Sequence, residues 1–466
     1  MPTAEKNLNR YEAILQSFSM ATMGHPSSLA AASQQTRLES NAKSAREAEI
    51  VSVSAGVAGP VLVSFVLWTL QQAFALGLER LYFISRDGEI LLQMAQRLLP
   101  AFWPERKLEL RYLLGSRQAW HLPSLSVSQH ATNDWLLFFF ETSSLKTIFS
   151  RVELTLADCQ DRLAAHGFSA DEWERKLSSA DRPAVEGLMQ DPVIQERIQQ
   201  RARDAMKPVL GYLEQEGLFE NTCYGLVDFA WTGRTKGSLE KLLRLRGKEA
   251  PPFFTFGRNG EQSQEDSTVL HAYLFNLQQN VGNDRYMPAI EALMEVFCTG
   301  LTSGLRCYQQ QDDGSYGPVY REANPRPVEA WGYQFMRDSI LHFTGQFAAN
   351  AAPQKSPPVL PPEASAALLQ SFWLSPTWAE AGAWGPFPFE EDQGGGTHLH
   401  LIPPVQLSPR LFWRLLRNGR GFDQRAVWQH GIAVLHSRPV GFAWLLVYRI
   451  RETLYKLKWS VSRVRS

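Results

Sequence analysis

The sequence has few cysteines and no net charge, and both features narrow the classes of protein to which it could belong. Its 466 residues include four cysteines, which lie far apart in the chain: Cys159, Cys223, Cys298 and Cys307. This spacing fits neither a CxxC-type zinc site nor a small disulfide-bonded domain, so reduced thiols in a cytoplasmic protein are expected. Basic and acidic residues number 47 each. No nucleic-acid partner is therefore expected, and any preference for anions must come from a local patch.

The sequence also lacks an uninterrupted apolar run of the length that crosses a membrane. Its most apolar window, residues 57–78, contains a Gly-Pro pair near its start and two glutamines inside. This pattern favours a buried helix beginning at Pro60 over a transmembrane segment. Residues 1–49 are polar, rich in Ala, Ser and Gln, and without the apolar core of a signal peptide. They are predicted to form a poorly ordered lead-in.

What the sequence does contain is an alternation of apolar strands and amphipathic helices. Strands are expected at residues 80–84, 108–114, 223–229 and 252–256, and helices at 89–99, 238–247 and 288–297. This alternation is typical of an α/β fold with a mostly parallel sheet and helices on both faces. The α/β catalytic domain is predicted to span residues 50–320.

Two further regions differ in composition from the α/β pattern. Residues 125–220 consist of long, charged amphipathic segments, which predict a helical insertion and a place for an acceptor-binding surface. Residues 321–466 contain the Pro-rich stretch AAPQKSPPVLPPE and the Gly-rich stretch DQGGGTH, which indicate a mostly helical C-terminal region with irregular loops.

The end of the chain, residues 441–466, is basic and rich in aromatic residues. Its only acidic residue is Glu452, against six basic residues: Arg449, Arg451, Lys456, Lys458, Arg463 and Arg465. Such a helix can lie in an anionic membrane interface, which would make the protein peripheral at the inner face of the membrane. The alternative is a helix docked on the protein with a solvated basic face. The composition leaves both open.

The stretch LYFISRDGE, residues 81–89, ends an expected strand in a turn similar to the first motif of haloacid-dehalogenase phosphatases. Asp87 and Gly88 match the second aspartate and the glycine of that motif, but Ser85 stands where the nucleophilic aspartate belongs. A serine with no base beside it can neither form the acyl-phosphate nor help to hold the metal. The turn instead favours an anion through helix N–H groups and Arg86, while Asp87 either caps the helix or has a ligand or metal role.

The next expected strand also ends in a turn that carries an arginine. Gly115, Ser116 and Arg117 follow it directly. Two neighbouring parallel strands with such turns would place Arg86 and Arg117 at the same carboxyl edge, where open α/β sheets bind their ligands.

A third turn has a more specific pattern. Asp228 ends an apolar strand and is followed by Thr232-Gly233-Arg234-Thr235 and a helix. This resembles the phosphoribosyl-pyrophosphate loop of phosphoribosyltransferases, in which a carboxylate binds ribose hydroxyls and the turn cradles the 5-phosphate. The usual pattern has two adjacent acidic residues, whereas Val227 occupies the first position here. An ordinary strand, turn and helix capped by Thr or Ser remains the alternative.

The motifs taken together resemble a bacterial family from surface-polysaccharide gene clusters. They are GVAGP at 56–60, YFISRDG at 82–88, LLGSRQAW at 113–120, VDFAWTGRTKGSL at 227–239 and PAIEALMEVF at 288–297. The family consists of glycan phosphoribosyltransferases, usually fused to a haloacid-dehalogenase-like phosphatase domain and often labelled predicted hydrolases of that superfamily. The resemblance covers about residues 50–305, and Ala230 departs from the family's VDxGWxG pattern. It implies transfer of 5-phosphoribosyl from phosphoribosyl pyrophosphate to a glycan or lipid-linked glycan, giving a ribofuranose after dephosphorylation.

The resemblance also implies roles for individual residues. Asp228, Arg86 and Asp87 would be catalytic: Asp228 binds the ribose diol, Arg86 stabilises the departing pyrophosphate, and Asp87 either coordinates Mg²⁺ or activates the acceptor hydroxyl. The predicted substrate-binding residues are Ser116, Arg117, Trp231, Thr232, Gly233, Arg234, Thr235, Lys236, Ser238 and, as a weaker candidate, Glu291.

Three functional hypotheses follow from these features. No DxD-type motif precedes residue 81, so the first hypothesis is a transferase module whose phosphatase acts in trans or is absent. The second is a hydrolase of the haloacid-dehalogenase type. The third is a non-catalytic scaffold in a polysaccharide-assembly complex.

Overall fold

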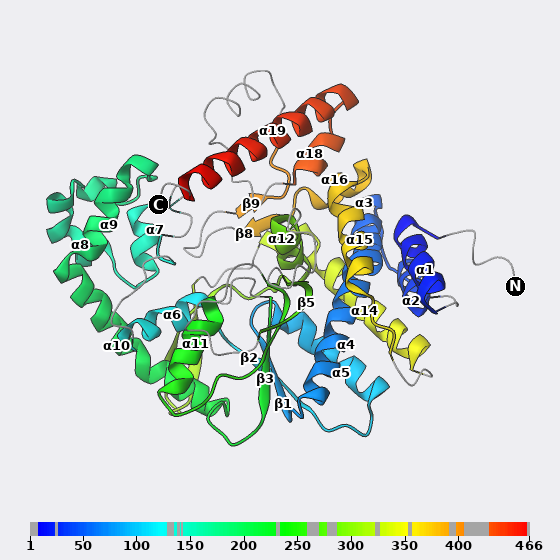
Figure 1. Ribbon diagram of the computed structural model, residues 1–466, viewed down its shortest axis with the longest axis horizontal. Coiled ribbons are helices and arrows are strands. Elements are labelled where there is room, and N and C mark those ends of the chain that lie inside the picture. Colours follow the sequence, from blue (N-terminus) through cyan, green and yellow to red (C-terminus); the bar gives the residue numbers. More distant parts are fainter. Residues whose placement is uncertain are drawn as a thin grey trace, which may run out of the picture.

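The centre of the protein is a five-stranded sheet in which every neighbouring pair of strands is parallel (Figure 1). The computed structural model describes residues 8–23, 27–127, 135–137, 140, 143–229, 234–258, 270–276, 287–321, 327–352, 357–390, 398–404 and 428–463. The strands are β1 (Arg80–Ile84), β2 (Glu109–Leu113), β3 (Tyr224–Asp228), β4 (Phe253–Arg258) and β5 (Leu270–Asn276), in the order β2-β1-β3-β4-β5. The α/β fold predicted from the alternation of strands and helices is confirmed.

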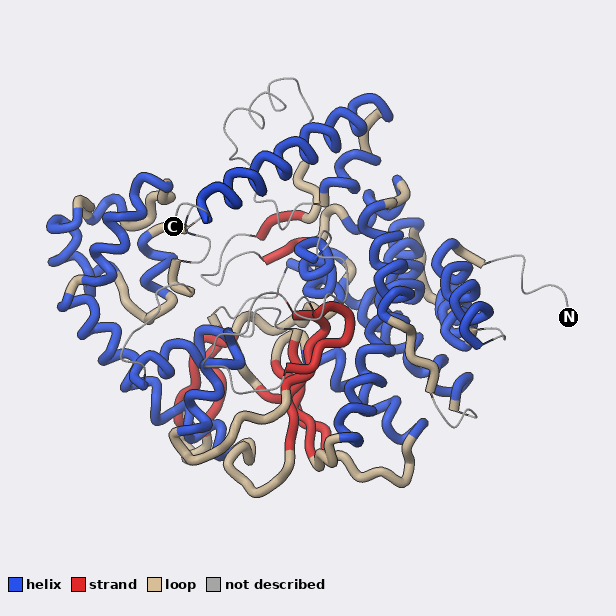
Figure 2. Tube along the Cα trace, viewed as in Figure 1, coloured by secondary structure: helices blue, strands red, loops and turns tan. Residues whose placement is uncertain are grey.

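Both faces of the sheet are buried because successive side chains on a strand point to opposite sides. Leu81 and Phe83 pack into the core with α4 (Gly59–Ala75) and α5 (Gly88–Phe102). Tyr82 and Ile84 pack on the other face with α6 (Arg117–Ser124), α10 (Pro192–Gln215) and α11 (Arg234–Arg244). Figure 2 shows the strands enclosed by these helices.

The sequence analysis predicted neither β5 nor two small hairpins. The antiparallel strands β6 (Leu305–Gln310) and β7 (Tyr316–Tyr320) form one hairpin, and β8 (Pro388–Glu390) pairs with β9 (His398–His400) in the other. Helix α12 (Met287–Phe297) lies between β5 and β6 in the chain, close to the predicted range 288–297.

A helical lobe occupies the range in which the insertion was predicted. Its α-helices are α7 (Leu145–Ser150), α8 (Leu156–Leu163), α9 (Arg182–Gln190) and the first part of α10, with short 3₁₀ turns at Leu125–Val127, Ala164–His166, Ala170–Glu172 and Ser179–Asp181. These elements share a hydrophobic core of their own, which includes Leu145, Phe149, Val185 and Ile198. In Figure 1 the lobe stands to one side of the sheet.

The prediction that residues 1–49 are poorly ordered is wrong for residues 8–23 and 27–49. They form α1 (Arg10–Met23), α2 (Ser28–Leu38) and the start of α3 (Ala45–Val53). Their few large apolar side chains, including Tyr11, Leu15 and Leu29, are buried in the main core. The outer faces of these helices are polar, and this composition led to the prediction of disorder. Packing of the apolar side chains against the main core is what stabilises the helices.

The apolar segment around Pro60 is longer as a helix than the sequence predicted. Ser44 and Glu47 form a capping box that starts α3, and a π-helical turn, Ser54–Ala58, connects α3 to α4. The predicted start at Pro60 lies one residue from the start of α4 at Gly59, but the sequence did not predict that a π turn joins α4 to the helix before it. In the part of the chain that the structure describes, Ala45–Ala75 is the one helix long and apolar enough to cross a membrane, and 94% of its most apolar window is buried in the fold. Packing in the core accounts for its apolar sequence.

The C-terminal region is mostly helical, as predicted. Its helices are α13 (Pro327–Trp331), α14 (Tyr333–Ala351), α15 (Pro362–Leu374), α16 (Trp378–Trp384), α18 (Gln429–Val434) and α19 (Arg438–Arg463). Phe343, Phe372 and Trp384 belong to the same hydrophobic core as α4 and α5. This region therefore packs directly against the helices on one face of the sheet.

Candidate functional site

The turn after β1 is held in place by Gly88 and Ser85. A Cβ on Gly88 would lie 2.6 Å from the carbonyl carbon of Phe83, so α5 can begin this close to the strand only with glycine there. The Ser85 hydroxyl donates to the Gly115 carbonyl and accepts from the Gly115 N–H, both at 2.9 Å. The serine at the phosphatase nucleophile position thus links the turns that follow β1 and β2.

Arg86 and Asp87 are partly buried in this turn. Asp87 occupies the N-cap position of α5, but its side chain makes no capping hydrogen bond, which removes the capping role considered for it. Burial, together with the nearby charge of Asp87, raises the pKa of the Cys298 thiol well above its usual value. Burial also raises the pKa of Tyr112, with contributions from the charges of Glu89 and Asp87. The Asp87 carboxylate therefore acts electrostatically on both side chains.

The segment after α12 passes beside the same turn. A Cβ on Gly300 would lie 3.2 Å from Glu89 Oε2 and 3.9 Å from Arg86 Cβ. The structure therefore brings the end of the PAIEALMEVF motif to the SRDG turn. The side chain of Glu291, the weaker candidate on this helix, lies outside the described residues.

The turn after β2 contributes one structural residue and one exposed cation. Ser116 caps α6 by accepting from the Ala119 N–H at 3.0 Å, and its hydroxyl donates to the Leu305 carbonyl at 2.8 Å. Both bonds of the Ser116 hydroxyl are made within the protein, so its role in this structure is to hold the turn. Arg117 is exposed, and its guanidinium has no hydrogen-bond or ion-pair partner among the residues that the structure describes.

Asp228 lies at the end of β3, beside the end of β1. Val227 stands opposite Phe83 in the parallel register, so the next residue, Asp228, is level with Ile84, the last residue of β1 before the turn at Ser85. Its side chain is 9% exposed, and Oδ1 accepts from the Phe229 N–H at 2.8 Å. Trp231, Thr232 and Gly233, together with the side chain of Arg234, fall outside the described residues.

Two residues of the predicted phosphate loop point into the protein from α11. Lys236 Nζ lies 3.1 Å from Glu240 Oε1, with both side chains only 3% exposed. Ser238 Oγ lies 2.5 Å from His121 Nδ1 on α6. Thr235, in the first turn of α11, is partly exposed. The Ser238 hydroxyl therefore links α11 to α6, the Lys236 ammonium forms a buried ion pair within α11, and Thr235 stays nearer to solvent.

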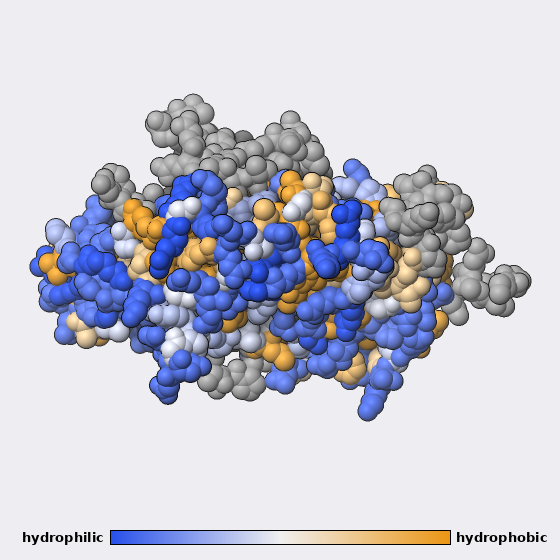
Figure 3. Space-filling view, turned by 90° about the horizontal axis from the view of Figure 1, so that it is seen from below, coloured by the Kyte–Doolittle hydropathy of each residue, from blue (hydrophilic) through white to orange (hydrophobic). Residues whose placement is uncertain are grey.

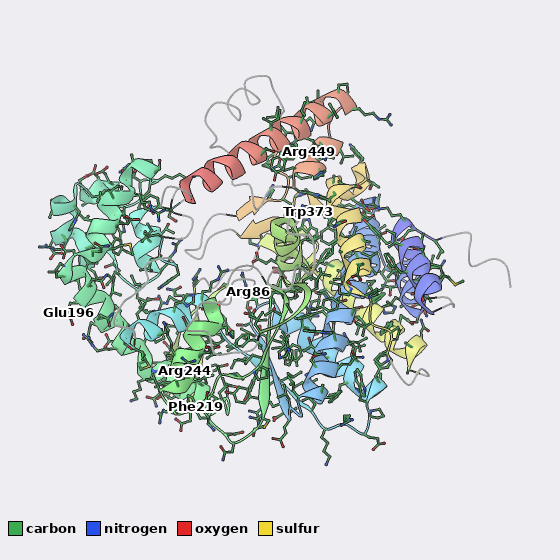
Figure 4. All side chains as sticks on the ribbon, viewed as in Figure 1. Arg86, Glu196, Phe219, Arg244, Trp373 and Arg449 are labelled. Atoms are coloured by element: carbon green, nitrogen blue, oxygen red, sulfur yellow. The ribbon has the colours of Figure 1, made fainter. Side chains whose placement is uncertain are left out.

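These turns meet at one edge because of the order of the strands. From β1 the chain passes to β2 on one side and then returns across β1 to β3 on the other, so the direction of winding reverses between β1 and β3. Open α/β sheets bind ligands at this switch point, outside the carboxyl ends of the strands. The N-termini of α5, α6 and α11 all lie at this edge, where helix dipoles favour anions (Figure 1). Arg86 stands there in Figure 4.

The donor set at this edge fits Mg²⁺ only in combination with a substrate. The residues described by the structure include no group of three or more histidine, cysteine, aspartate or glutamate side chains that could hold a metal ion. Mg²⁺ commonly binds through one or two carboxylates plus substrate phosphates and water. Asp87 and Asp228, on adjacent strand ends, suit that arrangement.

Some residues at this edge were not predicted. Tyr112 lies on β2, a strand that the sequence did indicate, and the charges of Glu89 and Asp87 help to raise its pKa. Arg337 comes from α14, where its guanidinium lies 3.5 Å from Glu89 Oε1 and 2.9 Å from Gln93 Oε1. No local pattern could have found Arg337, because tertiary packing alone brings α14 to α5.

The fold and the edge together define an open parallel α/β protein with arginines, aspartates and helix N-termini at its switch point. No protein-family model matches the chain, and no curated protein matches it either.

Proposed function

We propose that the chain is a glycan phosphoribosyltransferase that moves 5-phosphoribosyl from phosphoribosyl pyrophosphate to a glycan or lipid-linked glycan. The observation that supports the proposal is the position of Asp228, Arg86 and Arg117, which follow or end three neighbouring strands at the switch point of the sheet. The donor has a ribose diol between two phosphate groups, so it needs a carboxylate flanked by cations and N–H donors. The carboxyl edge supplies these chemical groups.

Each part of the donor has a candidate partner. Asp228 accepts hydrogen bonds from the ribose hydroxyls, and the start of α11 with Thr235 binds the 5-phosphate through N–H groups and the helix dipole. Arg86 and Arg117 bind the pyrophosphate. Negative charge on the pyrophosphate grows as it leaves, so these fixed cations stabilise the transition state more than the bound donor.

The transfer itself exchanges one bond at C1 of the ribose for another. The acceptor oxygen forms a bond to C1 while the bond from C1 to the pyrophosphate oxygen breaks, and the acceptor proton passes to a base. Asp87 lies at the start of α5 on this edge, where its carboxylate would either accept the proton or coordinate Mg²⁺. Mg²⁺, held by Asp87 and the phosphates, would neutralise charge on the leaving group. A separate phosphatase would remove the 5-phosphate from the product.

Phosphatase chemistry at the β1 turn has less support. Ser85, at the nucleophile position, both donates to and accepts from Gly115, which fixes the hydroxyl in the architecture of the turn. Among the residues that the structure describes, no basic side chain is hydrogen-bonded to this hydroxyl to activate it.

Isothermal titration with phosphoribosyl pyrophosphate and Mg²⁺ tests the proposal. We expect the wild-type chain to bind, and Asp228→Asn and Arg117→Ala each to weaken binding about tenfold or more, because hydrogen bonds to charged groups contribute about 1.5–3 kcal/mol. Arg244→Ala is the matched control, since this arginine lies at the opposite end of α11 (Figure 4). Its affinity should stay within about twofold of wild type.

Two results would overturn the proposal. A wild-type chain that shows no heat of binding would leave the scaffold as the better explanation. Mg²⁺-dependent release of phosphate from simple phosphate esters would instead favour the hydrolase.

A further inference from the structure

Helix α19 carries a line of exposed apolar side chains. Phe442, Leu446 and Ile450 are 71%, 49% and 44% exposed. They are four residues apart, so they follow one another along one face of the helix. The remaining exposed large apolar side chains of the described residues lie singly on different elements. Single exposed apolar residues are ordinary, whereas a continuous stripe marks a surface that binds something.

The opposite face of α19 is the one that docks on the protein. Trp444 is 3% exposed, and its indole N–H donates to Gln429 Oε1 on α18 at 2.9 Å. Gly441 packs closely on the backbone of Ala433. Because this face fixes the rotation of the helix about its axis, the stripe of Phe442, Leu446 and Ile450 faces outward.

The charge of the helix indicates what kind of surface the stripe binds. Arg438 and Arg449 are exposed, and Figure 4 marks Arg449 on α19. The sequence from residue 449 to the end adds further basic residues and a single acidic one, Glu452. An apolar stripe on a basic helix complements a surface that is both apolar and anionic. An acidic lipid bilayer has both properties.

We propose that α19 is an interfacial helix that binds this protein to anionic membranes, with the stripe of Phe442, Leu446 and Ile450 inserted between lipid headgroups. The inference depends on α19 alone and does not require the transferase proposal.

The position of α19 sets the orientation of the bound protein. In Figure 1 the helix runs along the side of the molecule toward which the carboxyl ends of the strands point. Figure 3 shows the opposite side, where hydrophilic residues cover most of the surface. A protein bound through α19 would therefore turn the switch-point edge toward the bilayer and the hydrophilic side away from it.

Vesicle co-sedimentation of the full chain tests the proposal. We expect the wild type to bind phosphatidylglycerol-containing vesicles at least tenfold more tightly than pure phosphatidylcholine vesicles, with weaker binding as salt concentration rises. The triple variant Phe442→Ser, Leu446→Ser, Ile450→Ser should bind the anionic vesicles at least tenfold more weakly. Since these side chains are exposed, the variant should keep the circular dichroism spectrum and unfolding midpoint of the wild type.

A second triple variant is the matched control. Met20→Ser, Leu38→Ser and Trp378→Ser remove apolar side chains that are 50%, 64% and 68% exposed on other elements, and vesicle binding should not change. The proposal is overturned if the wild type ignores anionic vesicles, or if both triple variants bind them as the wild type does. It is also overturned if the stripe instead holds two copies of the chain together, seen as a wild-type dimer that the first triple variant converts to a monomer without any lipid binding.

Discussion

Several side chains at the carboxyl edge of the sheet build the turns there. The hydroxyls of Ser85, Ser116 and Ser238 are all engaged in hydrogen bonds within the protein. Arg117 is exposed, and the Asp87 side chain makes no capping hydrogen bond to α5. Local sequence predicted that these residue types would meet at strand ends. It could not assign hydroxyl partners, because Gly115, Leu305 and His121 lie far away in the chain.

Gly88 provides the first test at this scale. Gly88→Ala would force a Cβ to within 2.6 Å of the Phe83 backbone, and backbone atoms cannot move aside, so we expect a loss of about 1–3 kcal/mol in unfolding free energy. Gly345→Ala, on an open and exposed part of α14, should instead stabilise by about 0.5–1 kcal/mol. Urea unfolding measures both. Equal effects in the two variants would contradict the close approach at Gly88.

The buried side chain of His430 should make the stability of the protein depend on pH. Burial and the nearby Arg449 charge lower the pKa of this histidine to about 4, from 6.5. Between pH 6.5 and 4 the unfolded chain binds a proton that the folded protein does not. The free energy of unfolding therefore decreases as the pH is lowered from 6.5 to 4. His430→Gln should have a shallower decrease than wild type, measured by unfolding at a series of pH values. Parallel curves for the two proteins would refute the assignment.

At the scale of elements, the strongly patterned segments were predictable and the contact-dependent ones were not. β1, β3 and α5 follow clear apolar runs and amphipathic periods. Helices α1 and α2 are polar overall, and only their packing against the main core stabilises them. The continuation of α3 through a π turn into α4 was also missed, because a Gly-Pro pair is a local signal for a helix start.

Helix α11 allows a structural role to be separated from a binding role. Ser238→Ala removes the bond to His121 between α11 and α6, so we expect a loss of about 1–3 kcal/mol in stability, because a buried partner loses its hydrogen bond. Thr235→Ala, in the first turn and partly exposed, should leave stability within about 0.5 kcal/mol and weaken binding of phosphoribosyl pyrophosphate. Unfolding and titration calorimetry distinguish the two. The reverse pattern would place the phosphate at Ser238.

At the scale of the whole molecule, distant parts of the chain form one core. Glu380, on α16, is 2% exposed, accepts from the Tyr11 hydroxyl at 2.5 Å and forms an ion pair with Arg10. The N-terminal helix therefore depends on a carboxylate 369 residues from Tyr11 for this contact. The sequence separation of these residues explains why the order of the N-terminal segment was not predicted.

Glu380→Gln tests this connection. The substitution removes the charge that pairs with Arg10, and we expect a loss of about 2 kcal/mol, below the usual cost of breaking a fully buried pair because Arg10 is 32% exposed. Glu186→Gln is the control: its exposed pair with Arg182 should contribute less than about 0.5 kcal/mol. Urea unfolding and hydrogen exchange in α1 measure the effects. An unchanged α1 in Glu380→Gln would show that apolar packing alone holds it.

Sequence alone determined the α/β class, the turns that contain Ser85 and Ser116, the strand end at Asp228, and the helical character of the C-terminal region. It could do so because periodicity and turn residues act over a few neighbouring positions. Tertiary structure decided the strand order that puts Asp228 beside the β1 turn, and the inward direction of the Lys236 and Ser238 side chains. It also decided the folding of α1 and α2 and which face of α19 points outward. Each of these depends on contacts between residues far apart in the chain, for which local patterns carry no information.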